Sequence, residues 1–113
     1  MIRSLAAKSV TTPIAIEISK ITGGLPEITA GMVIITGILG NAFGAEVLRL
    51  MGIKNKKAIG TALGTAAHGI GTAKSLEMGN SPGTYSGLAM CFNGIITALL
   101  GPYILEWMIT YFQ

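Results

Sequence analysis

A single histidine lies in the middle of a long apolar stretch, where a titratable side chain is costly. His68 is the only titratable residue between Lys57 and Lys74. At membrane depth such a residue is a functional candidate, because it could hydrogen-bond a polar solute or carry a proton near neutral pH. The alternative is a neutral histidine that bonds a backbone carbonyl on a packed helix. We favour the functional interpretation, since the glycines and threonines around His68 keep space and polarity close to the ring.

Hydroxyl side chains and a proline form a second candidate, in the run Ser9-Val10-Thr11-Thr12-Pro13. Pro13 has no backbone N–H and disfavours helical geometry at Thr12, so we predict a broken helix. The carbonyls of residues 9–12 then need protein, water or a solute as partners. Unwound carbonyls suit cations, and half-helix N-termini suit carboxylates, as in the midplane sites of carriers. A threonine-capped kink without a ligand fits this sequence equally well.

Most other chemistry is excluded by the residue inventory. One histidine and one cysteine cannot form a zinc site, and Gly69-Ile70-Gly71 follows no strand, so it is no nucleotide loop. We therefore predict no metal and no cofactor. Counting residues leaves a Ser–His–acid triad open, but the sequence has no local signature of one, so we predict no enzyme. The net charge of +3 comes from scattered residues, which argues against nucleic acid as a partner. Asn93 and Thr97 are expected to bond a neighbouring helix rather than a substrate, and Cys91 is expected to be buried.

The elements that position these residues are predicted to be transmembrane helices. Only 12% of the chain is charged, whereas soluble domains have about 25%. No charged residue lies between Glu27 and Glu46 or between Glu77 and Glu106. A helix needs about 20 mostly apolar residues to cross a hydrocarbon core of about 30 Å. The lipid bilayer is therefore the expected surroundings, and the fold class is all-α integral membrane.

Four apolar segments can be distinguished, covering residues 5–21, 26–51, 58–76 and 82–112. Pro26 suits the first position of the second helix. The first segment is broken before Pro13, and the third is so rich in glycine that it is a poor lipid-facing helix. We expect the third to unwind around Gly69-Ile70-Gly71 and the fourth to kink at Gly101-Pro102. Together the segments resemble one repeat of a secondary carrier.

Two pairs of glycines have the spacing of helix-packing motifs. Gly40 and Gly44 form one pair, and Gly60 and Gly64 form the other. Small residues four apart let a neighbouring helix approach closely in a membrane. We predict that these four glycines lie at helix–helix contacts.

The charged loops predict how the chain is oriented. Residues 54–57 contain the only basic cluster, and short basic loops stay in the cytoplasm. If each segment crosses once, both termini lie inside a multi-pass plasma (inner) membrane protein. A third segment that enters and returns would reverse the sidedness of everything after it.

Three motifs in order resemble the LrgB/CidB family. They are Lys8-Ser9-Val10-Thr11-Thr12-Pro13-Ile14-Ala15, Thr36-Gly37-Ile38-Leu39-Gly40 and Gly64-Thr65-Ala66-Ala67-His68-Gly69-Ile70-Gly71-Thr72-Ala73. The resemblance implies one LrgB-like domain over residues 1–113, corresponding to the C-terminal half of the family's usual length. It also implies that Thr11, Thr12, Pro13, His68, Gly69 and Gly71 lie in the functional core.

The family resemblance implies two kinds of activity. Members are called antiholin-like, after a role in controlling murein hydrolases and lysis with a small LrgA or CidA partner. A plant relative resembles a glycolate/glycerate exchanger, and bacterial members are linked to pyruvate movement. Our leading hypothesis is part of a permease for small carboxylates, and the alternative is an antiholin-like regulator. The substrate-binding residues would be Ser9, Thr11, Thr12, Pro13, His68, Gly69, Gly71 and Thr72. The missing N-terminal half or a second copy would complete the assembly.

Overall fold

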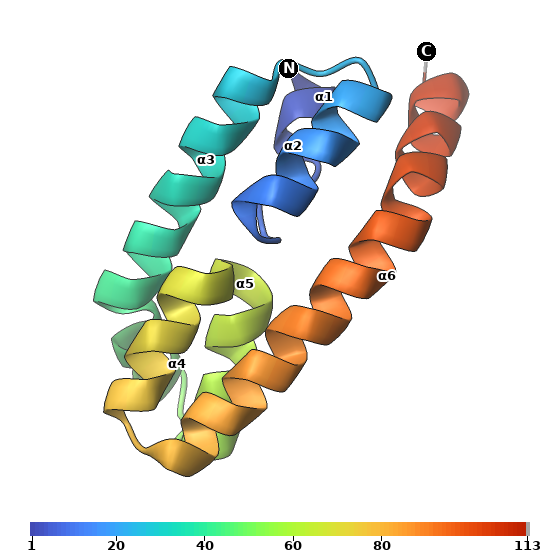
Figure 1. Cartoon of the computed structure of the whole chain (residues 1–113). Helices are drawn as coiled ribbons and strands as arrows, with labels where there is room; N and C mark the ends of the chain where they lie inside the picture. The colour runs from blue at the N-terminus through green and yellow to red at the C-terminus, as the bar shows by residue number, and fades with distance from the viewer. Residues whose placement is uncertain (113) are drawn as a thin grey trace.

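The computed structural model describes residues 1–112, and the regular structure within them is helical (Figure 1). The elements are α1 (Ile2–Leu5), α2 (Thr12–Ile21), α3 (Pro26–Leu39), a π-helical turn η1 (Gly40–Gly44), α4 (Ala45–Leu50), α5 (Lys56–Glu77) and α6 (Asn80–Phe112). The predicted all-α class is therefore confirmed for these residues.

Two helices are long and apolar enough to cross a membrane, by length and composition. The first is the continuous helical stretch Pro26–Leu50, which contains α3, η1 and α4, and the second is α6. The first contains 25 residues, about 38 Å of helix, which exceeds the hydrocarbon core. Pro26 is its first residue, as predicted, and the turn before it needs a glycine, because Gly23 has φ +72°.

Residues 2–21 form a short hairpin, which we call the N-terminal hairpin. Its two arms are α1 and α2, and its tip is the turn at residues 6–11. The arms are held side by side at the open end, where the backbone N–H of Leu25 donates to Ser4 Oγ at 2.8 Å and Arg3 donates to the carbonyl of Thr22. The predicted break before Pro13 is present, since α2 begins at Thr12 after an extended Thr11.

Helix α5 is also a hairpin, which we call the α5 hairpin. Its first half runs parallel to the start of α6, because Gly60 packs on Pro82 and Gly64 packs on Ser86. Its second half returns, so that Gly71 packs against the carbonyl of Leu63. Figure 1 shows both ends of α5 near the start of α6, with the tip pointing toward the N-terminal hairpin.

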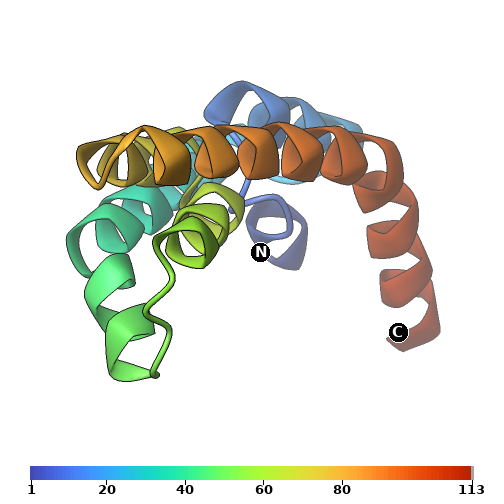
Figure 2. The same cartoon turned by 90° about the horizontal axis from the view of Figure 1, so that it is seen from below.

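The position of the break in α5 differs from the prediction. The non-helical residues are Ala67 (φ −124°) and His68 (φ 43°), rather than the glycines at 69–71. Glycine propensity suggested the wrong place because Gly71 is used for close packing against the first half of α5. The first and third segments are hairpins, so four separate crossings are not confirmed. Figure 2 shows α6 bending in its C-terminal part, where Pro102 lies within the helix.

The outer faces of the two long helices are apolar and exposed. Ile34, Ile35 and Ile38 on α3 are each about half exposed, as are Ile95 and Ile96 on α6. The buried side chains form two small clusters, one around the N-terminal hairpin and Val33 and one between α4 and α5. Cys91 is exposed, which corrects the prediction that it is buried, because it lies on the outer face of α6. Such a surface suits lipid or further helices rather than water.

The α5 hairpin leads to a prediction about sidedness. In a Cys91→Ser background, Lys54→Cys and Ser81→Cys should react with a membrane-impermeant maleimide from the same side, because they flank a segment that returns. Labelling of intact cells and of inverted vesicles measures this. A single crossing by α5 would instead place the two cysteines on opposite sides.

Candidate functional site

The tips of the two hairpins are joined through one side chain of α6. Asn93 Nδ2 donates to the carbonyl of Ser9 at 3.0 Å and to the carbonyl of Thr65 at 2.9 Å. Thr97 Oγ1 in turn donates to Asn93 Oδ1 at 3.3 Å. The prediction that Asn93 and Thr97 bond neighbouring helices is confirmed for Asn93. Thr97 instead hydrogen-bonds Asn93 on the same helix.

Two hydroxyls at the junction of the N-terminal tip and α2 have no internal partner. Ser9 Oγ accepts from Lys8 Nζ at 3.1 Å. The half-buried Thr11 and Thr12 hydroxyls make no hydrogen bond to the protein within residues 1–112. Thr11 precedes α2 and Thr12 is its first residue, so both lie at the positive end of that helix dipole. This arrangement suits a hydrogen-bond acceptor or an anion.

The His68 ring is hydrogen-bonded to another part of this chain. Its side chain is 4% exposed, and Nε2 lies 3.0 Å from the carbonyl oxygen of Val33 on α3. Because a carbonyl only accepts, Nε2 must carry the proton. This is the geometry of the second interpretation, a histidine bonded to a packed helix. His68 is also the non-glycine residue with positive φ among residues 1–112, a conformation that costs about 1–3 kcal/mol.

The remaining predicted residues of the α5 hairpin are also engaged in internal contacts. Thr72 Oγ1 donates to the carbonyl of His68 at 2.9 Å and lies 2.9 Å from Ser86 Oγ. Gly71 is buried, whereas Gly69, which starts the returning half, is exposed. Asn41 Nδ2 on η1 donates to the carbonyl of Ile70 at 2.9 Å. Our sequence reasoning missed Asn41, although an amide inside an uncharged apolar run is a usable signal.

The four glycines predicted to pack helices have neighbours from this chain. A side chain at Gly40 would overlap Ala67, and one at Gly44 would overlap Leu63. Side chains at Gly60 and Gly64 would overlap the backbone of α6 at Pro82 and Ser86. Glycine at these four positions therefore lets the α5 hairpin pack closely against η1 and α6.

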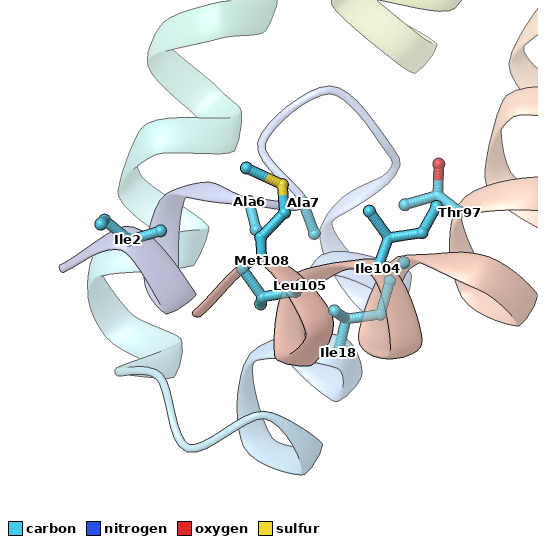
Figure 3. A pocket seen from close by; sticks show the side chains of 9 residues that line it. Ile2, Ala6, Ala7, Ile18, Thr97, Ile104, Leu105 and Met108 are labelled. Carbon is cyan, nitrogen blue, oxygen red and sulfur yellow. The ribbon is translucent and has the colours of Figure 1, made fainter. Parts of the chain in front are cut away.

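The pocket in Figure 3 lies away from the predicted site. It encloses about 310 Å³ between the N-terminal hairpin and the C-terminal half of α6. Its lining is aliphatic apart from Thr97, which also donates to Asn93. A second groove of about 350 Å³ beside the N-terminal tip is lined by Thr11, Ile14 and residues of α6. Apolar walls of this kind suit a hydrocarbon group or a neighbouring helix.

Lys8 lies in the N-terminal tip, and several charged side chains outside the two tips form ion pairs. Arg3 pairs with Glu106, Lys20 with Glu17 at 2.8 Å, and Lys74 with Glu77 at 2.9 Å. Their side chains are one-third to two-thirds exposed, so each pair contributes little to stability. Within residues 1–112 no three His, Cys, Asp or Glu side chains come together as metal ligands.

Comparison with known proteins gives the family. The sequence profile of the LrgB-like family matches residues 1–107. The chain belongs to the LrgB family. Family membership and the two long apolar helices make it a membrane protein. The matched region of this LrgB-family chain includes both hairpins, α3 and most of α6, and so includes the contacts of Asn93.

Three relatives illustrate the similarity. Protein YwbG of Bacillus subtilis is 44% identical over 96% of this chain and 48% of its own length. Holin-like protein CidB of Staphylococcus epidermidis is 36% identical over 90% of the chain and 44% of its own length. Antiholin-like protein LrgB of Bacillus subtilis is 34% identical over 94% and 46%. The chain thus spans about half the length of these relatives, and no solved structure matches it.

The strained backbone of His68 predicts an unusual order of stabilities in this LrgB-family chain. His68→Ala loses the bond to Val33 and keeps the strain, whereas His68→Gly loses the bond and relieves the strain. We expect His68→Gly to be more stable than His68→Ala by about 1–2 kcal/mol in thermal unfolding in detergent. Ala66→Gly is the control, because Ala66 lies before the break and glycine there should destabilise by about 1 kcal/mol. The same order at both positions would contradict a strained His68.

Proposed function

We propose that this chain is an antiholin-like membrane component that acts by assembling with other membrane helices. The support is the naming of its relatives as antiholin-like LrgB and holin-like CidB. The chain is about half as long as those relatives, and the outer faces of α3 and α6 are apolar and uncovered. In this proposal it lies in the plasma (inner) membrane as a multi-pass protein, with residues 54–57 in the cytoplasm.

The partners proposed are a small membrane protein of the LrgA/CidA type and the remaining half of a family-length protein, or a second copy. Helix association in a membrane depends on close packing, which small residues allow. Gly40, Gly44, Gly60 and Gly64 already pack within the chain. Gly31 on α3 and Gly87 on α6 have open space where a side chain would lie. They are therefore the glycines at which an incoming helix can approach.

This proposal predicts a difference between inner and outer glycines. Gly31→Leu and Gly87→Leu should leave the thermal unfolding temperature near that of the unsubstituted chain while reducing co-purification with an LrgA/CidA-type protein. Gly64→Leu should destabilise the chain by about 1–3 kcal/mol or more, because it meets the backbone at Ser86. Both effects are measured on tagged protein extracted from membranes. Unchanged capture by both outer variants would contradict these docking faces.

A second function, carriage of small carboxylates such as pyruvate, glycolate or glycerate, is favoured by one observation. The two hairpins approach each other from opposite ends of the molecule (Figure 1). Their tips are joined by the side chain of Asn93. Carriers bind solutes at such helix interruptions, where half-helix N-termini meet anions. The Thr11 and Thr12 hydroxyls, at the start of α2, are free to donate to a carboxylate.

The carrier function predicts that Thr12 matters for uptake. Thr12→Val keeps the size of the side chain and removes one donor, so apparent affinity should fall about tenfold, the equivalent of 1.4 kcal/mol. The measurement is uptake of labelled pyruvate and glycolate by proteoliposomes that contain this chain and the remaining half of the family length.

Thr61→Val is the matched control for this experiment. The Thr61 hydroxyl donates to the carbonyl of Lys57 on its own helix at 2.9 Å and lies outside both tips. Its uptake should equal that of the unsubstituted chain. Equal uptake by Thr12→Val and Thr61→Val would rule out a solute contact at Thr12.

A further inference from the structure

We propose that Asn93 is a positioning residue that couples the two hairpins and holds their tips at one spacing. The inference rests on and deepens the carrier function proposed above, in which a solute would bind at the tips. The coupling itself rests on hydrogen bonds and can be tested without transport. We infer the coupling from the two carbonyls that Asn93 binds, those of Ser9 and Thr65, because neither has an N–H partner within a helix.

The first carbonyl belongs to Ser9 and is left free by proline chemistry. In a continuous helix the carbonyl of residue 9 accepts from the N–H of residue 13. Residue 13 is proline and has no N–H, and the chain turns at residues 6–11 instead of continuing as a helix. The Ser9 carbonyl therefore needs a donor from elsewhere in the protein.

The second carbonyl belongs to Thr65 and is left free by the break in α5. Its helical partner would be the N–H of Gly69, but Ala67 and His68 between them have non-helical dihedral angles. The last carbonyls of a helix need side chains, water or ligands when the helix stops. The carbonyls of Thr65 and Ser9, on opposite hairpins, thus both need a hydrogen-bond donor.

One amide meets both needs. The two N–H bonds of Asn93 Nδ2 point to the two carbonyls, at 3.0 Å and 2.9 Å, and Thr97 fixes the amide by donating to Oδ1. No other side chain in residues 1–112 hydrogen-bonds both hairpins. Gly94, the next residue, allows this approach, because a side chain there would lie 3.0 Å from Ile14 on α2.

The consequence is a geometric coupling. Asn93 lies in α6 before the bend near Pro102, so both tips are attached to the same helical segment. If either tip moves away from α6, a backbone carbonyl loses its donor in apolar surroundings, which is unfavourable. The tips therefore keep a single spacing while the amide is present, and α6 carries any displacement of one tip to the other.

The test measures the spacing between the hairpins directly. Spin labels are attached at Lys8→Cys and Thr61→Cys, two exposed positions, in the Cys91→Ser chain, and their distance distribution is recorded by pulsed EPR in nanodiscs. The chain that keeps Asn93 should give one narrow peak in the distance distribution. Asn93→Leu and Asn93→Asp, which lack the two donors, should lose that peak. A single unchanged peak in both variants would overturn the proposal.

Asn41→Leu is the matched control. Asn41 also donates to a backbone carbonyl of the α5 hairpin, that of Ile70, but it has no bond to the N-terminal hairpin. Its narrow peak should persist, and loss of the peak in Asn41→Leu as well would contradict a specific role for Asn93. Should Asn93→Leu and Asn93→Asp fail to fold, Thr97→Val replaces them. A broadened peak for Thr97→Val supports the coupling, and an unchanged peak contradicts it.

A transport measurement separates this inference from the carrier function. In the proteoliposomes described above, Asn93→Asp should raise the KM for uptake more than it lowers the maximal rate, since it changes the spacing of the tips. A larger loss of maximal rate than of affinity would contradict control of solute binding by Asn93. If no variant or unsubstituted chain moves solute, the carrier function fails, while the distance measurement still decides the coupling.

Discussion

The structure depends on one constraint: backbone polar groups released where a helix breaks must find partners inside an apolar protein. Breaks occur at residues 6–11 and at Ala67–His68, and each frees carbonyls that no helical N–H can reach. Asparagine amides supply the missing donors, Asn93 to both breaks and Asn41 to the second. The ring of His68, at the second break, hydrogen-bonds the carbonyl of Val33 on α3.

Glycine provides the short distances that these side chains need. A side chain at Gly37 would overlap Ile70 and the ring of His68, so glycine at this position lets the histidine reach α3. Gly60 and Gly64 similarly bring α5 onto α6, where Ser86 meets Thr72. The glycine-rich motifs that resemble the LrgB family are thus explained by contacts within the chain. Their role within the chain is to close the α5 hairpin and to pack it against its neighbours.

The positions of the helices were predicted better from the sequence than the direction of the chain within α5 and the packing between helices. Charge-free intervals and Pro26 located the long helices, and Pro13 located the first break, because these signals are local. The return of α5 was left open, since it depends on contacts between the two halves of α5, such as Gly71 with Leu63, that the sequence pattern does not show. For His68, the sequence showed that a buried polar ring needs a partner, but the choice between solute and Val33 depends on how α3 lies against α5.

In the carrier function proposed above, the internal hydrogen bonds of the α5 hairpin would decide where a solute can first bind. Thr72 and the Nε2 of His68 already have protein partners, so a solute at that tip must displace an existing bond. The Thr11 and Thr12 hydroxyls at the N-terminal tip carry no such cost, and they lie at the positive end of α2. A carboxylate would therefore meet the N-terminal tip first. Because Asn93 joins the tips, a displacement of the N-terminal tip on binding would be transmitted through α6 to the α5 hairpin. Direct contact between the solute and His68 would not be needed.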